Sequence, residues 1–198
     1  MRLDIYLQNL NNISRTKAQN LIKSGNVFVN GIAITKCGFE VDDKCQIKIT
    51  NELKYVSRAG LKLEGACEKF GINLTGDVVL DIGSSTGGFS DYCLQNGASK
   101  VYCVDVGTNQ LDAKIRNDPR VVVKENTDIR NVDARDFLDV NMIVCDVSFI
   151  SLTKISQKIA DIMSVGCQGV ILVKPQFECG KEIAKKYKGV IKDANVHK

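Results

Sequence analysis

The sequence contains no long hydrophobic run, and this absence excludes a membrane-spanning helix. No apolar stretch approaches the roughly 18 residues that such a helix needs. The opening residues MRLDIYLQNL have neither a long apolar segment nor a small-residue cleavage site, so we expect no signal peptide. With 44% hydrophobic and 25% charged residues, the composition is that of an ordinary folded soluble protein.

Paired cysteines are also missing. None of the eight cysteines forms a CxxC pair, which argues against a zinc site and against the disulfide framework of a secreted domain. Several lie in apolar runs, where a reduced cysteine behaves as a small hydrophobic residue. We therefore expect a cytoplasmic protein without a bound metal.

Net charge is small, but it is unevenly placed. Residues 1–60 hold nine lysines and arginines against five acidic residues, whereas basic and acidic residues are equal in number over 61–198. The whole excess of +4 therefore lies in the first 60 residues. A small basic module before a neutral one indicates a polyanionic partner, and a merely solvated basic face is the alternative.

Residues 78–90, VVLDIGSSTGGFS, contain the most informative motif of the chain. A short apolar run typical of a buried strand is followed by small residues and glycines, and then by a helix-like segment. Strand, glycine-rich turn and helix form the nucleotide-binding half of a doubly wound sheet. Any Rossmann-like domain with a glycine turn is the more general interpretation.

The turn differs from the two common phosphate-binding motifs. A phosphate loop needs a lysine directly after its second glycine, but Phe89 follows Gly88. The dinucleotide fingerprint needs GxG, but Gly83 is followed by two serines. Asp81, two residues before the first glycine, instead suits a cationic ligand.

Two further acids favour an adenosine ligand. Asp105 ends an apolar run at 101–104 and lies 22 positions after Gly83, where an acid binds ribose hydroxyls. Asp128 follows the run at 121–123, where it either accepts a hydrogen bond from an adenine amino group or caps a turn. A nucleoside with a sulfonium and no pyrophosphate is S-adenosylmethionine, which we predict as the cofactor.

The pattern along residues 56–198 predicts an α/β fold. Helical spacing follows the segment SRAG at Leu63, Cys67 and Phe70, and again over 152–163. Asp81, Asp105, Asp146 and Lys174 all fall where a strand ends, which is the edge at which ligands bind in such sheets. The five predicted strands lie at 78–82, 101–104, 121–123, 142–145 and 170–173.

The first 50 residues predict a small α+β module. Leu3, Ile5, Leu7 and Leu10 suit a first helix that Asn11-Asn12 breaks. Ser14 is expected to cap a second helix and Gly25 to end it. Asn30-Gly31 between short apolar runs predicts a hairpin, and a further strand fits 46–50.

This N-terminal pattern closely resembles the S4 RNA-binding domain. The matching run is R2-L-D…L7…S14-R15…A18…L21-I22…G25-x-V27-x-V29-N30-G31…K36, within residues 1–55. The resemblance implies that Arg15 and Lys17 face RNA phosphates, together with backbone N–H groups at the helix start. The expected RNA-binding residues are Arg2, Arg15, Lys17, Lys23 and Arg58.

A methyl transfer to a ribose hydroxyl would need a base. A lysine can accept the hydroxyl proton if neighbouring cations or burial lower its pKa, and two lysines near one acid suit this task. A base N-methyltransferase would tend to carry [DNS]PP[YFW], and the sequence has no Pro-Pro pair. A cysteine-dependent C5-methyltransferase stays open on position, because Cys145 and Cys179 lie near the ends of predicted strands.

Nearly the full chain resembles the TlyA (haemolysin A-like) family, which joins an S4 domain to an FtsJ/RrmJ-like methyltransferase. The matching segments are SRAGLKL, LDIGSSTGGFSD, CDVSFISL and LVKPQFE, besides the S4 pattern. The resemblance implies 2′-O-methylation of cytidine in large-subunit (23S) ribosomal RNA, in some members also in small-subunit (16S) RNA. It also implies domains at 1–55 and 56–198, with a linker over 51–55.

The same resemblance assigns site residues. The family's Lys-Asp-Lys-Glu tetrad maps onto Lys62, Asp146 and Lys174, with Lys174 as the catalytic lysine. The expected cofactor-binding residues are Asp81, Gly83, Ser84, Ser85, Gly87, Gly88, Phe89, Asp105 and Asp128.

The chain departs from the family at its end. The family continues for several tens of residues and supplies the last strands and the final glutamate there, and neither Glu178 nor Glu182 occupies that position. We therefore expect a methyltransferase sheet that is incomplete after the fifth strand, which would leave an exposed edge. An RNA-binding protein without catalysis is the alternative function. An S4-containing pseudouridine synthase is disfavoured by the β-α alternation.

Overall fold

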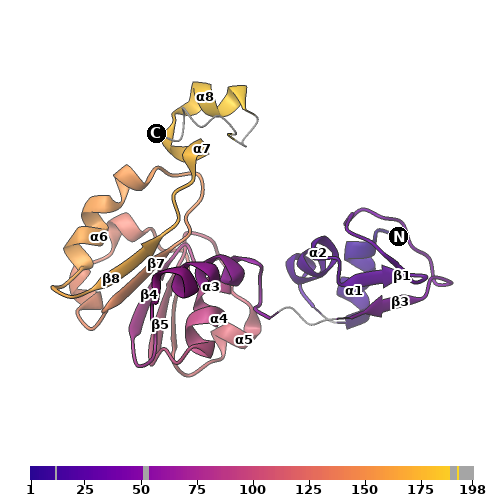
Figure 1. Ribbon diagram of the computed structural model, residues 1–198, viewed down its shortest axis with the longest axis horizontal. Helices are drawn as coiled ribbons and strands as arrows, with labels where there is room; N and C mark the ends of the chain where they lie inside the picture. The colour runs from indigo at the N-terminus through magenta and orange to yellow at the C-terminus, as the bar shows by residue number, and fades with distance from the viewer. Residues whose placement is uncertain (12, 51–53, 188–190, 192–198) are drawn as a thin grey trace. The chain divides into compact units, whose positions relative to one another are not determined.

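The computed structural model describes residues 1–11, 13–50, 54–187 and 191. The chain forms two compact units, Met1–Ala59 and Gly60–Lys198 (Figure 1). Residues 51–53 of the expected linker lie outside the described residues, whereas Tyr55 in the same stretch is buried. The domain boundary between 55 and 56 stays a prediction.

The first unit packs two helices beside a three-stranded antiparallel sheet of order β2-β1-β3 (Figure 1). Leu3 and Leu7 of the first helix, Ile22 of the second and Val27 of the sheet are fully buried and share one hydrophobic cluster. The elements are α1 Leu3–Asn11, α2 Arg15–Lys23, β1 Val27–Val29, β2 Ile32–Ala33 and β3 Ile47–Ile49.

Local sequence signals account for this unit well. The Ser14 side chain accepts a hydrogen bond from the Lys17 N–H and so caps α2. Asn30 and Gly31 both have positive φ, 49° and 83°, as a tight two-residue hairpin requires. Helix α1 ends at Asn11, the first residue of the pair that was expected to break it.

The second unit is built on a five-stranded parallel sheet of order β6-β5-β4-β7-β8. The central strand β4 pairs with β5 on one side and with β7 on the other. All five strands therefore end at the same edge. They are β4 Val78–Ile82, β5 Lys100–Val104, β6 Val121–Lys124, β7 Met142–Cys145 and β8 Gln168–Ile171.

Helices cover both faces of this sheet (Figure 1). Ile155, Ile159 and Ile162 pack with Leu80 and Ile82 on the α6 face. The α4 face includes Asp81, whose carboxylate meets Ser90 of α4. The helices are α3 Ala59–Phe70, α4 Gly88–Gln95, α5 Ala113–Arg116, α6 Ser156–Ile162, α7 Pro175–Glu178 and α8 Lys181–Lys186.

Two details of the second unit differ from the expectation. The segment 152–163 is not one helix, because a 3₁₀ turn at Leu152–Lys154 precedes α6. The last strand begins at Gln168, two residues early, and ends at Ile171. The helix expected after SRAG is confirmed as α3, and Phe70, its last residue, is 69% exposed before Gly71 turns the chain with a φ of +65°.

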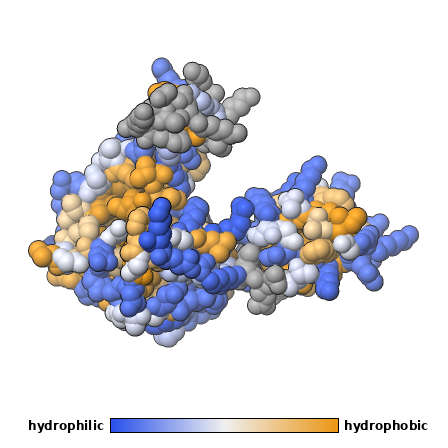
Figure 2. Space-filling view, viewed as in Figure 1, coloured by the Kyte–Doolittle hydropathy of each residue, from blue (hydrophilic) through white to orange (hydrophobic). Residues whose placement is uncertain are grey.

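Strand β8 lies at one end of the sheet and exposes apolar side chains. Ile171 and, just beyond the strand, Val173 are exposed, as is Val165 before it. Figure 2 shows hydrophobic side chains gathered over this region of the second unit. Within the described residues, β8 pairs only with β7.

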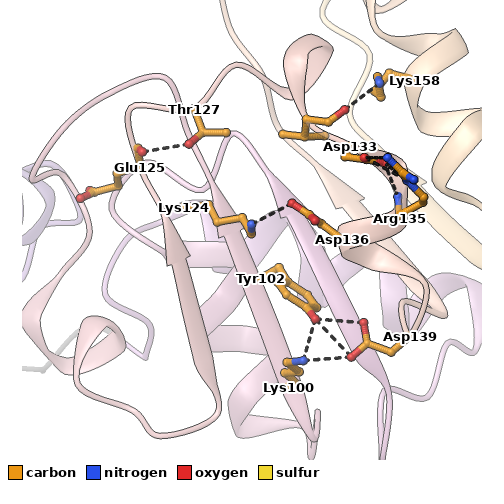
Figure 3. A network of polar contacts seen from close by, with 11 residues as sticks. Lys100, Tyr102, Lys124, Glu125, Thr127, Asp133, Arg135, Asp136, Asp139 and Lys158 are labelled. Atoms are coloured by element: carbon orange, nitrogen blue, oxygen red, sulfur yellow. Dashed lines mark hydrogen bonds and ion pairs between the residues drawn. The ribbon is translucent and has the colours of Figure 1, made fainter.

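A polar cluster lies near the N-terminal ends of the strands of this sheet (Figure 3). The buried Tyr102 donates its hydroxyl to Asp139 at 3.0 Å, and Lys100 Nζ contacts both groups, at 2.6 and 2.9 Å. The Tyr102 ring meets the edge of Phe137 with centroids 5.2 Å apart. The candidate site lies at the other, C-terminal ends of the strands.

Gly87→Ala should destabilise the second unit. Gly87 has a φ of +89°, and a Cβ there would lie 2.9 Å from Leu111 Cδ1. We expect the free energy of unfolding to fall by about 1–3 kcal/mol, measured by urea denaturation.

The matched control for this variant is Gly65→Ala in α3. A Cβ at Gly65 meets nothing within 4 Å, so helix propensity should stabilise the protein by up to about 1 kcal/mol. Equal effects of the two substitutions would contradict this account of Gly87.

Candidate active site

Gly83, directly after the central strand β4, lies where the ends of the neighbouring strands β5 and β7 come together. Gly83 donates its N–H to Val104 O at 2.8 Å, and Asp146 donates its N–H to Ile82 O at 3.1 Å. A Cβ on Gly83 would lie 3.2 Å from Asp146 O, and its φ is +82°. Glycine is therefore required for the loop after β7 to pack against the turn after β4.

Two lysines share the carboxylate of Asp146. Lys62 Nζ lies 2.9 Å from Oδ2, and Lys174 Nζ lies 2.5 Å from Oδ1. The lysines come from different elements: Lys62 from the first turn of α3, and Lys174 from the end of the segment after β8. Lys62 is about half exposed, whereas Lys174 is only 17% exposed. The structure thus brings together the three residues that were predicted as catalytic.

Lys174 is held by further contacts that the sequence analysis missed. Its Nζ donates to Ser148 Oγ at 2.7 Å. Glu178 of α7 accepts from Ser151 Oγ at 2.6 Å and from the Leu152 N–H at 2.9 Å. These contacts tie the element that follows Lys174 to the loop that follows Asp146. The segment CDVSFISL contained both serines, but nothing in their spacing indicated these partners.

Asp81 is completely buried beneath the glycine turn. Its Oδ2 accepts from Ser90 Oγ at 2.5 Å, whereas its Oδ1 has no partner among the described residues. Burial raises the pKa of Asp81 to about 7, against the hydrogen bonds from Ser90, and the charges of Asp146 and Asp105 add to the rise. Ser84 Oγ is a second buried polar atom without a partner in this part of the chain.

The Asp105 side chain holds the glycine turn by accepting hydrogen bonds from backbone N–H groups. Its Oδ2 accepts from the Ser85 N–H at 2.8 Å, and its Oδ1 accepts from the Gly107 N–H at 2.7 Å. Ser85 has a φ of 48°, which few residues other than glycine adopt. Gly87 and Gly88 join this turn to α4, and Phe89 in the first turn of α4 is buried.

Glu125, a residue that the sequence analysis did not single out, organises the loop after Asp105. It accepts from the backbone N–H groups of three consecutive residues, 109–111, at 3.1, 2.8 and 3.0 Å, and pairs with Arg116 at 2.5 Å. Burial opposes the charge, but the hydrogen bonds from Arg116 and these N–H groups outweigh it and lower the pKa of Glu125 to about 2. Its own carbonyl accepts from Thr127 Oγ1 at 3.0 Å (Figure 3).

Asp128 caps a turn, as one of the two interpretations of the sequence stated. Its side chain accepts from the Arg130 N–H, and it forms an ion pair with the Arg130 guanidinium at 2.5 Å. The predicted contact with an adenine amino group stays a prediction.

The predicted RNA-binding residues of the first unit fall into two groups. Arg2 and Arg15 both pair with the buried Asp4, at 3.0 and 3.2 Å. Lys23 and Arg58 are exposed, and Lys17 is half-buried at the start of α2.

The cysteine alternative finds little support. Cys145 is buried at the end of β7, and burial raises the pKa of its thiol to about 12, so it is not a ready nucleophile. Cys179 is half-buried just after α7 and donates weakly to Gly180 O at 3.7 Å.

Neither a metal-binding group nor a membrane-spanning helix is found among the described residues. Over these residues, no group of three or more His, Cys, Asp or Glu side chains is arranged to hold a metal ion. None of the described helices is long and apolar enough to cross a bilayer.

Two family models match the chain. The model for FtsJ-like methyltransferases matches residues 55–198, and the model for the S4 domain matches residues 1–46. Together they cover almost the whole sequence.

Curated relatives and a solved structure resemble the chain over most of its length. "Hemolysin A" of Brachyspira hyodysenteriae is 45% identical over 98% of this chain and 81% of the relative. The "23S rRNA (cytidine-2'-O)-methyltransferase TlyA" of Campylobacter jejuni is 40% identical over 98% of this chain and 82% of the relative. A structure described as a candidate hemolysin from Streptococcus thermophilus superposes with a TM-score of 0.74 at 40% identity, covering 100% of this chain and 73% of the other.

The burial of Asp81 predicts a pH-dependent stability. A carboxyl whose folded pKa is about 7 contributes stability below pH 4 that is lost as the pH rises towards 7, because the unfolded chain then ionises more readily. Relative to Asp81→Asn, the free energy of unfolding of the wild type should fall by up to about 4 kcal/mol between pH 4 and 7 and stay level above. Urea denaturation at each pH measures it, and a pH-independent difference would contradict the assignment.

Proposed function

The chain belongs to the family of FtsJ-like methyltransferases with an N-terminal S4 domain, the family of TlyA and hemolysin A, and on that premise we propose that it methylates ribosomal RNA. The proposed reaction transfers a methyl group from S-adenosylmethionine to the 2′-hydroxyl of a cytidine. Large-subunit RNA is the first substrate to test, since the Campylobacter relative is named for 23S rRNA. The observation that carries the proposal is the shared carboxylate of Asp146 between Lys62 and Lys174.

The residues around the glycine turn fit S-adenosylmethionine. Asp81 Oδ1 and Ser84 Oγ are buried polar atoms with no partner in the described chain, and buried polar groups in proteins are normally hydrogen-bonded. At the two ends of the turn, a Cβ on Gly83 would lie 3.2 Å from Asp146 O and a Cβ on Gly87 would lie 2.9 Å from Leu111 Cδ1, so both positions require glycine. Asp81 would hold a cationic group of the cofactor, and Asp105 would hold its ribose. When bound, the cofactor supplies a methyl group on a sulfonium, which leaves as a thioether.

Lys174 is the proposed base for the 2′-hydroxyl. It is largely buried, and Ser148 and Asp146 fix its amine from two sides. Proton acceptance requires the neutral amine. As the ribose oxygen forms its bond to the methyl carbon, the hydroxyl proton passes to the Lys174 nitrogen.

Asp146 and Lys62 position this base. Asp146 uses one oxygen for each lysine, so its orientation sets both amines. Lys62 is more exposed than Lys174 and would contact the ribose or an adjoining phosphate of the RNA. Holding the hydroxyl in line with the methyl group accounts for much of the rate in a displacement of this kind.

The first unit supplies RNA affinity in this proposal. Its S4 match and its excess of basic residues indicate contacts to the RNA backbone. Arg2, Arg15, Lys17, Lys23 and Arg58 are the proposed contact residues.

Lys174→Ala should lower methyl transfer by about 100-fold or more, because it removes the base. Transfer of labelled methyl from S-adenosylmethionine to unmodified large and small ribosomal subunits, assayed separately, measures the effect. Cofactor affinity, measured by calorimetry, should stay within about threefold of the wild type. Lys154→Ala is the control, since Lys154 is an exposed lysine in the nearby 3₁₀ turn.

Other outcomes would select other functions. Transfer at the normal rate by Lys174→Ala would show that Lys174 is not the base. Tight RNA binding by the wild type without any transfer would favour an RNA-binding protein without catalysis. Isomerisation of uridine would revive a pseudouridine synthase.

A further inference from the structure

A fully buried carboxylate lies between two arginines of the first unit. Asp4, in the first turn of α1, has no exposed surface. Its Oδ1 and Oδ2 accept from Arg2 Nε and Nη2, both at 3.0 Å. Its Oδ2 also accepts from Arg15 Nε at 3.2 Å and from Gln19 Nε2 at 2.8 Å. One carboxylate thus joins residues from before α1, from the start of α2 and from its middle.

These contacts keep Asp4 ionised despite its burial. The hydrogen bonds from Arg2 hold the pKa of Asp4 well below its usual range, against the effect of burial, with Gln19 and Arg15 adding to them. The carboxylate is therefore a fixed negative charge at any pH near neutrality.

The two arginines use only part of their donors on Asp4. A guanidinium carries five N–H donors. Arg2 uses donors on two of its nitrogens and Arg15 on one, while their side chains stay 48% and 51% exposed. The remaining N–H groups have no partner among the described residues, so each guanidinium is oriented and still has donors for another anion.

We propose that Asp4 is a positioning residue that fixes Arg2 and Arg15 as a pair of oriented guanidiniums for RNA phosphate oxygens. An ordered arginine loses less conformational entropy when it binds a phosphate, and its planar fork suits bidentate contact. The inference deepens the RNA-binding role proposed above and rests on it.

If only net charge mattered, Asp4 would weaken RNA binding, which is the opposite of the positioning effect proposed here. A negative charge beside two arginines reduces the positive potential that attracts RNA, so its removal should tighten binding if only net charge mattered. If Asp4 orients the arginines, its removal should weaken binding instead. The sign of the effect therefore separates positioning from bulk electrostatics.

Asp4→Asn tests this sign with a side chain of the same shape. We expect its dissociation constant for unmodified, in vitro transcribed 23S ribosomal RNA to rise about five- to thirtyfold over the wild type. The salt dependence of binding should become shallower, because fewer phosphates are contacted. The full chain is used, at a temperature where circular dichroism shows every variant to be folded.

Asp43→Asn is the matched control. Asp43 is an exposed acid of the same unit, and its removal changes the net charge equally. We expect unchanged or slightly tighter RNA binding from it. Gln19→Ala is a second variant that removes a ligand of Asp4 with no change of charge, and we expect it to weaken binding about two- to fivefold.

A double-mutant cycle shows whether Asp4 acts through the arginines. In an Arg2→Ala, Arg15→Ala background, Asp4→Asn should no longer weaken RNA binding. Persistent weakening there would mean a general structural role and would overturn the inference. Binding of Asp4→Asn as tight as the wild type, while the arginine variants bind weakly, would also overturn it. If the wild type binds no RNA, or the arginine variants bind normally, the RNA-binding role of these residues itself fails.

Discussion

The parallel pairing of β4 between β5 and β7 is the constraint on which the second unit depends. It brings the ends of three strands to one edge and places Asp81, Asp105 and Asp146 there, although they are far apart in sequence. Because Asp146 donates its N–H to Ile82 O, its position is set by the last residue of β4. The glycine turn then allows the two loops to touch, so that the proposed cofactor-binding and catalytic residues share one edge.

Buried and half-buried carboxylates hold separate segments together in both units. Asp4 and Glu125 each accept hydrogen bonds from several donors in separate segments, and Asp146 pairs with two lysines from separate segments. A carboxylate has about four acceptor sites, so one side chain can fix several loops at once. Asp81 differs, because its Oδ1 has neither a hydrogen-bond donor nor an ion-pair partner among the described residues and its pKa is raised. Asp4, Glu125 and Asp146 thus bind groups of the protein itself, whereas Asp81 has an oxygen available for a ligand.

Much of the fold could be predicted because its signals are local. The Ser14 cap, the Asn30-Gly31 hairpin and the apolar strands depend on neighbouring residues alone. The alternation of strands and helices also placed Asp146 and Lys174 at one edge, and family resemblance added Lys62. The roles of Glu125 and Ser148 could not be predicted, because their partners are distant and follow no spacing rule.

The order of the strands has a consequence for how the protein folds. The N–H of Val78, at the start of β4, donates to the Asn141 side chain just before β7, a separation of 63 residues, whereas the strands of the first unit pair at separations of 3 to 22 residues. Closing so long a loop costs chain entropy before any contact offsets it, which makes parallel pairing slow. During synthesis the first unit is complete well before β7 leaves the ribosome. The RNA-binding part of such a chain therefore forms early, and the carboxylate between the two lysines reaches its place late.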